Sequence, residues 1–143
     1  YILQIQKGVA MLNKKLNVFV VDDDDLVRQA IVGLLRSEGH EVFEFGSPGV
    51  AIVQISHFLL LKKRLDLVIS DLTMPETSGK LVLWHAKMIS NGEIGTILMS
   101  GNTEEEVKDA ARAAKADAFL MKPMRLNDII KTIDEVFPEL VVS

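Results

Sequence analysis

The feature that most constrains the fold of this chain is a regular alternation of short β-type runs with longer helical patterns. Runs rich in β-branched and aromatic residues are typical of strands, and apolar residues spaced three and four apart are typical of helices. The predicted strands are 17–21, 41–45, 66–70, 96–100 and 118–121. The predicted helices are about 25–37, 48–62, 78–90, 103–115 and 126–136.

Local signals agree with these boundaries. Gly39 follows the first predicted helix, where a left-handed residue is favoured. Ser47 and Pro48 offer an N-cap followed by a proline at the first helical position. Thr103 and Glu106 form a capping-box pattern at the start of the fourth helix.

Five strands that alternate with five helices predict an α/β fold, in which helices cover both faces of a parallel sheet. Two doubly wound strand orders are common, and they differ in where the order reverses. A five-stranded chain of 143 residues suits the flavodoxin-like order 2-1-3-4-5. Its ligand crevice lies at the carboxyl ends of the first and third strands.

The length predicts a single domain, which we place at 17–137. Because the chain does not begin with methionine, we interpret 1–16 as an N-terminal extension or a leader. Residues 138–143 are expected to form a C-terminal tail.

Composition narrows the function further. The chain has no cysteine, which excludes disulfides, thiolate zinc sites and cysteine catalysis and is compatible with the cytoplasmic location that we expect. The net charge of −4 and the lack of a basic stripe argue against direct binding of nucleic acid. No apolar stretch approaches the length of a transmembrane helix, so we expect no membrane contact.

Polar side chains gather at the carboxyl ends of four predicted strands. Asp22 and Asp23 follow the first strand, Asp71 follows the third, Ser100 ends the fourth and Lys122 follows the fifth. Any one of them has an ordinary explanation as a turn former, a helix cap or a surface residue. Together they predict one ligand site, because these strand ends meet at a single edge of the sheet.

The residue types in this site point to phosphoryl transfer. Crowded carboxylates repel each other unless a cation joins them, and Mg²⁺ (or Mn²⁺) suits such oxygen ligands. A carboxylate can act as the nucleophile and form an aspartyl phosphate. The reaction then needs mainly alignment and charge neutralisation, which the metal, the Lys122 ammonium and the Ser100 hydroxyl can supply.

Four motifs resemble the receiver domains of response regulators in bacterial two-component systems, and the resemblance covers about 17–137. The motif residues are VVDDD at 20–24, LVISDLTMP at 67–75 with Gly79 after it, ILMSG at 97–101 and FLMKP at 119–123. Their order and spacing make the resemblance specific, and the element around Asp71 is its strongest part.

The resemblance implies a role for each site residue. Asp71 would accept the phosphoryl group from a sensor histidine kinase or a phosphotransfer protein. Asp23 would be the main metal ligand, with Asp22 supporting it, and Asp71 and the backbone carbonyl of Thr73 would complete the protein ligands. Lys122 would pair with the Asp71 carboxylate and then with the phosphoryl group.

The resemblance also implies a switch. Ser100 would move towards the phosphoryl group and Phe119 would turn with it. This would alter the surface made by the fourth helix, the fifth strand and the fifth helix, which a downstream output domain or protein would recognise. Such a chain is a signalling domain that assists only its own phosphorylation and dephosphorylation, and not an enzyme with an external substrate.

Two other interpretations remain open. The pattern Asp23-x-Asp25-x-Val27 resembles the nucleophile motif of haloacid-dehalogenase-type phosphatases, with Asp23 as the nucleophile. That family's late acidic pair is missing, and Asp71 would be left without a role. A phosphate-independent interaction module of the same fold is the other alternative, although every acidic and lysine position of the motif is present.

The run 58–61, Phe-Leu-Leu-Leu, departs from the pattern of a compact receiver. Four consecutive apolar residues on a helix cannot all face one side. The run is therefore either a packed helix end or part of an interface with a partner or a second copy, which would make the chain a homodimer.

Overall fold

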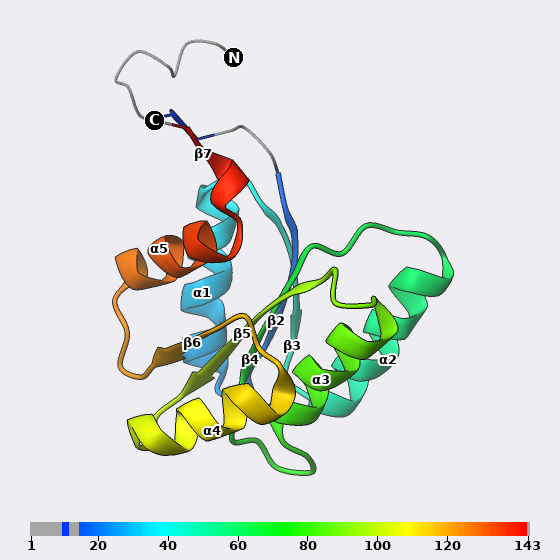
Figure 1. Ribbon diagram of the computed structural model, residues 1–143, viewed down its shortest axis with the longest axis vertical. Helices are drawn as coiled ribbons and strands as arrows, with labels where there is room; N and C mark the ends of the chain where they lie inside the picture. Colours follow the sequence, from blue (N-terminus) through cyan, green and yellow to red (C-terminus); the bar gives the residue numbers. More distant parts are fainter. Residues whose placement is uncertain (1–9, 12–14, 143) are drawn as a thin grey trace.

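The structure is a computed structural model that describes residues 10–11 and 15–142 (Figure 1). The strands are β1 (Ala10–Met11), β2 (Asn17–Val21), β3 (Glu41–Phe45), β4 (Leu67–Asp71), β5 (Gly95–Ser100), β6 (Ala118–Met121) and β7 (Val141–Val142). The helices are α1 (Asp25–Ser37), α2 (Pro48–Leu60), α3 (Gly79–Ile89), α4 (Glu104–Ala114), α5 (Leu126–Val136) and the 3-10 turn η2 (Pro138–Leu140).

The main sheet has the order β3-β2-β4-β5-β6, and all of its neighbouring strands are parallel. These strands correspond to the five predicted strands in the order 2-1-3-4-5. The predicted doubly wound sheet is therefore confirmed. Boundaries differ by one or two residues. Strand β4 begins at Leu67, one residue later than predicted. The Asp66 carboxylate, just before the strand, accepts a hydrogen bond of 2.8 Å from the Asn17 backbone N–H at the start of β2.

Helices cover both faces of this sheet, as Figure 1 shows. Helices α1 and α5 lie on one face and pack on side chains such as Val18 and Val20. Helices α2, α3 and α4 lie on the other face, where Phe19 and Val21 point. The alternation follows from the period of two along a strand. Burial on both faces explains why the central strand β4 is apolar along most of its length.

The predicted helix ends are confirmed where the structure shows their caps. The Ser47 side chain accepts a hydrogen bond from the Val50 N–H at the start of α2. Gly39, after α1, has a φ of 92°. At the start of α1 the N-cap is Asp24, whose carboxylate accepts from the N–H groups of Leu26 and Val27. Asp24 therefore caps α1, whereas Asp22 and Asp23 do not take part in this cap.

A small second sheet lies outside the five-stranded one. Strands β1 and β7 pair antiparallel, with Ala10 opposite Val142 and Met11 opposite Val141. Neither strand was predicted, because a two-residue run carries too little periodicity to be recognised. Among the described residues, no helix combines the length and the apolar composition that crossing a bilayer requires.

Candidate functional site

The centre of the site is a pair of buried carboxylates at the ends of neighbouring strands. The β2–β4 register places Val21 opposite Ser70, so that Asp22 and Asp71 follow side by side. Asp22 is 0% exposed and Asp71 is 6% exposed. Asp22 Oδ1 accepts a hydrogen bond of 2.9 Å from the Asp24 N–H, which fixes the direction of the Asp22 carboxylate.

Lys122 joins these two carboxylates. Its Nζ lies 3.0 Å from Asp22 Oδ2 and 3.0 Å from Asp71 Oδ1. The side chain starts from the end of β6, where the Lys122 N–H donates to the Ser100 carbonyl at 2.7 Å. The pairing with Asp71 was expected from the sequence, whereas the contact with Asp22 was not. The signal for it was available, since a carboxylate directly after a buried strand needs a cationic partner.

Three carboxylates converge on one point. Asp22, Asp23 and Asp71 each offer an oxygen, and these oxygens lie within 4.8 Å of one another. Such a set of hard oxygen donors fits a divalent cation. Asp25 is not in this group, because it lies in the first turn of α1 and pairs with Arg28 Nη2 at 2.7 Å. The second aspartate of the phosphatase-like pattern is therefore engaged elsewhere.

The loop from β4 to α3 folds back tightly over the end of β4. A Cβ at Gly79 would lie 1.8 Å from the Asp71 carbonyl oxygen, so only glycine fits there. The Gly79 N–H donates to the Leu72 carbonyl at 2.9 Å and closes the loop. Thr73, whose carbonyl was expected to bind metal, lies exposed in this loop two residues after Asp71. Gly79 thus fixes the end of β4 and the segment that contains Thr73.

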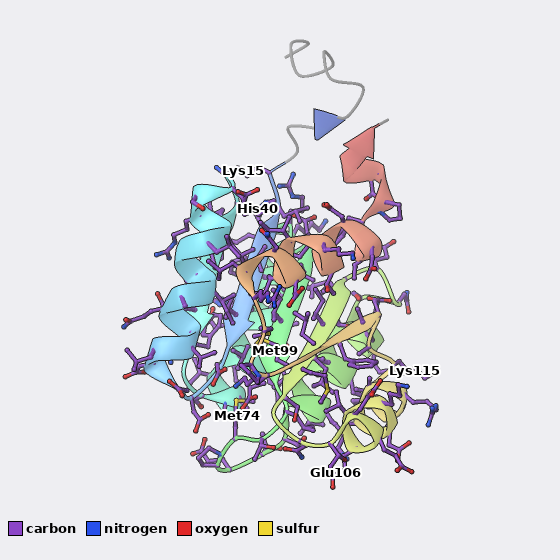
Figure 2. The ribbon with its side chains drawn as sticks, turned by 90° about the vertical axis from the view of Figure 1, so that its left-hand side faces the viewer. Lys15, His40, Met74, Met99, Glu106 and Lys115 are labelled. Carbon is purple, nitrogen blue, oxygen red and sulfur yellow. The ribbon has the colours of Figure 1, made fainter. Side chains whose placement is uncertain are left out.

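Met74 and Met99 show where the loop after β4 lies and how it is attached. Figure 2 shows Met74, from the same loop, at the opposite end of the molecule from Lys15 and His40. Met99, on β5, is fully buried, and its carbonyl accepts from the Leu72 N–H at 2.8 Å. The loop that carries Thr73 is therefore hydrogen-bonded to β5 directly after Asp71.

Ser100 and Phe119 lie beside this cluster, on the next two strands. The Ser100 side chain is 1% exposed, and its Oγ accepts a hydrogen bond of 3.0 Å from the Asn102 N–H in the turn before α4. Phe119 is half-buried on β6, opposite Leu98 of β5, and packs on the core below α2, α3 and α4. Both residues thus connect the site to α4 and β6.

The electrostatics of the site are dominated by burial and by an excess of negative charge. Burial raises the pKa of Asp71, and the nearby Asp22 and Asp23 raise it further, against the opposing effect of the Lys122 ammonium. Burial alone would lower the pKa of Lys122, but its hydrogen bonds to Asp71 and Asp22 outweigh this and raise it. The raised pKa of Asp71 and the raised pKa of Lys122 are consistent with each other, because a single ammonium pairs with several carboxylates.

Comparison with known proteins places this fold and site in one family. The family model of the response regulator receiver domain matches residues 18–134. The chain belongs to this family, and is thus a receiver domain of the kind found in two-component response regulators.

Individual relatives agree. A probable transcriptional regulatory protein of Picosynechococcus sp. (strain ATCC 27264 / PCC 7002 / PR-6) is 32% identical over 85% of this chain and 49% of its own length. The sensor kinase CckA of Brucella abortus (strain 2308) is 34% identical over 87% of this chain and 13% of its own length. The chain thus spans about half of the first relative and a smaller share of the second.

A solved structure shows the same fold. The CheY-like response regulator receiver domain protein of Methanospirillum hungatei JF-1 superposes with a TM-score of 0.77 at 25% identity. The match covers 89% of this chain and 97% of that one.

Replacing Asp71 by asparagine should stabilise the metal-free protein at neutral pH. The raised pKa means that the folded state keeps the Asp71 proton at pH values where the unfolded chain, with an ordinary value of 3.8, has lost it. The unfolded state then binds fewer protons, so stability falls as pH rises through this window. Asparagine, being neutral, avoids that loss.

Urea unfolding in the presence of a chelator measures the effect at neutral and at mildly acidic pH. We expect Asp71→Asn to have a higher free energy of unfolding than wild type at neutral pH. The difference between the two should become smaller at mildly acidic pH. Asp25→Asn, which alters an exposed carboxylate in the first turn of α1, should not increase the stability. A less stable Asp71→Asn at neutral pH would show that the Lys122 pairing outweighs burial and repulsion.

Proposed function

We propose that this receiver domain takes a phosphoryl group onto Asp71, with a divalent cation bound beside it. The observation that carries the proposal is the placement of the Asp71 carboxylate. It lies within reach of two further carboxylates and 3.0 Å from the Lys122 ammonium, at the carboxyl edge of the sheet. This set supplies a nucleophile, a metal-binding group and a cation at one point.

The chemistry is a displacement at phosphorus. An oxygen of the Asp71 carboxylate attacks the phosphorus of a phosphohistidine, the new P–O bond forms, and the P–N bond breaks as the imidazole leaves. Lys122 would then pair with a phosphoryl oxygen as well as with the carboxylate, which it already contacts. Ser100 lies on the neighbouring strand β5, and its hydroxyl would donate a hydrogen bond to another phosphoryl oxygen.

Mg²⁺ is the cation that we propose, with Mn²⁺ as a substitute. The proposed ligands are a carboxylate oxygen each of Asp23 and Asp71 and the Thr73 carbonyl, with Asp22 supporting the cation partly through water. A small hard cation that keeps several waters suits a site that uses few protein ligands. When bound, it would neutralise charge on the phosphoryl oxygens.

We infer the partners from the family and the relatives. A sensor histidine kinase or a phosphotransfer protein would donate the phosphoryl group, and a downstream output domain or protein would read the result. The similarity to a transcriptional regulatory protein and to part of a sensor kinase supports both a separate regulator and a receiver within a larger kinase. We propose a cytoplasmic signalling domain without an external substrate, and a homodimer whose surface is argued below.

We propose that the signal leaves the site through Ser100. Its Oγ caps the turn before α4 by accepting from the Asn102 N–H. A charge-assisted bond to a phosphoryl oxygen is stronger than this neutral one and would draw the hydroxyl away. The released turn and the space beside β6 would let Phe119 turn inward, changing the α4–β6–α5 surface.

Phosphorylation tests the acceptor. Incubation with acetyl phosphate or phosphoramidate and magnesium should add one phosphoryl group to the wild-type chain, measured by intact-protein mass spectrometry. Asp71→Asn should stay unmodified because it lacks the nucleophilic oxygen. Equal labelling of the variant would sink the assignment of Asp71.

Calorimetric titration with Mg²⁺ tests the metal ligands. Asp23→Ala should abolish binding, because it removes one of three converging oxygens. Asp25→Ala is the matched control from the same turn, and it should bind normally while losing about 0.3–1 kcal/mol of stability as a first-turn acid. Loss of binding and phosphorylation only in Asp25→Ala would favour the phosphatase-like arrangement instead.

The switch is tested by NMR with beryllofluoride, a stable mimic of the phosphoryl group. We expect amide shifts at Asn102, along α4 and at Phe119 in wild type. Ser100→Ala should still accept phosphate on Asp71 but show much weaker shifts at α4, because the hydroxyl that links the two is gone. Wild-type shifts confined to residues that touch the ligand would contradict the switch.

A further inference from the structure

The outer sides of α2 and α3 carry large apolar side chains that the described residues leave substantially exposed. Each of the six is between 42% and 78% exposed. They are Val53, Leu60, Leu61, Leu81, Trp84 and Met88, and we call them the α2–α3 face. A contiguous apolar patch on a soluble domain commonly marks an interaction site.

The six residues belong to one surface because the two helices lie side by side (Figure 1). The Ser56 hydroxyl and His85 Nε2, 2.8 Å apart, tie α2 to α3 at mid-length. Val53 and Leu60 are seven positions apart and therefore share one side of α2. The same spacing relates two of the exposed residues on α3, so the stripes run along neighbouring helices.

The apolar run at the end of α2 divides between the core and this face. The Phe58 ring packs edge-on against Phe19 and Phe43, with centroids 4.9 and 5.2 Å apart. Leu60 and Leu61 point away and are 78% and 52% exposed. The packed helix end and the exposed apolar surface are therefore both present, in different residues of the run.

Charge indicates what covers this face. Helix α2 contains no Asp, Glu, Lys or Arg among its 13 residues. In a two-fold contact the residues nearest the axis meet their own copies, so a charge in the middle of the surface would face an identical charge. An uncharged helix avoids this repulsion, whereas it offers a charged partner nothing to recognise. We propose that the α2–α3 face binds a second copy of this chain, with the two α2 helices antiparallel.

Charges at the two ends of α2 favour the antiparallel direction. At its start, the exposed Glu76 accepts a hydrogen bond from the Ser47 hydroxyl at 3.5 Å. Directly after its end comes the exposed Lys62. Antiparallel packing brings Lys62 of one copy near Glu76 of the other, at both ends of the contact. Parallel packing would place like charges together.

The size of the face suits a dimer that forms at high protein concentration. A helix of this length is about 20 Å long and about 10 Å across. Two such helices side by side outline about 400 Å², which is about half of the ~800 Å² that each partner loses in a standard interface. The active-site carboxylates lie at the sheet edge and not on this face, so the dimer leaves them accessible.

Sedimentation of the full chain, unphosphorylated and in chelator, tests the proposal without depending on Asp71 chemistry. Wild type should dimerise, and Leu60→Glu should raise the dimer dissociation constant about tenfold or more, because two leucines leave the contact. Leu26→Glu on α1 is the matched control, since Leu26 is 79% exposed, and it should dimerise like wild type. Leu60→Glu should still be phosphorylated on Asp71.

A charge swap tests the direction. Lys62→Glu and Glu76→Lys should each weaken the dimer, and the double variant should restore it, because the pair is rebuilt across the interface. Wild type that stays monomeric at high concentration would overturn the proposal. Weakening by Leu26→Glu but not by Leu60→Glu would place the contact on α1, and failure of the double variant to recover would exclude the antiparallel arrangement.

Discussion

The contact on which the site depends is that of one ammonium with two buried carboxylates. Asp22 is fully buried, and a buried carboxylate is tolerated only when it is paired and hydrogen-bonded. Its cation, Lys122, comes from the end of β6, at the far edge of the sheet, so the strand register must be correct for Asp22 to be neutralised. Because Asp71 shares the same ammonium and Asp23 adds a third carboxylate, negative charge remains in excess. This imbalance attracts a divalent cation, and it adds to the larger effect of burial in raising the pKa of Asp71.

The parts of the fold that the sequence predicted are those with a local cause. The patterns of strands and helices predicted the order of the sheet. Asp71 and Lys122 each follow a buried strand, which predicted that their side chains lie close together. Other features depend on neighbours distant in sequence. The Lys122–Asp22 contact spans a hundred positions, and the need for Gly79 arises from the approach of the Asp71 carbonyl. The β1–β7 pair consists of two-residue strands from opposite ends of the chain, which no periodicity can reveal.

Strands β5 and β6, beside the strands that carry the acids, connect the site to α4. The Ser100 carbonyl accepts from the Lys122 N–H, and the Ser100 hydroxyl caps the turn into α4. Phe119 lies three positions before Lys122 on β6. Ser100 is therefore hydrogen-bonded to both the site lysine and the turn before α4. Under the proposed switch, a change of charge at the Asp71 carboxylate would act on this serine and alter the packing of α4, as in a two-state element.

The proposed dimer and the metal site share a segment of chain. Glu76, at the end of the α2 contact, lies in the loop between β4 and α3 that also contains Thr73 and is closed by Gly79. A contact from Lys62 of a second copy would restrict this loop, and a cation on the Thr73 carbonyl would restrict it as well. Linkage makes any such effect reciprocal, so under the proposed arrangement dimerisation would change the affinity for the cation by the same factor by which the cation changes the affinity of the dimer.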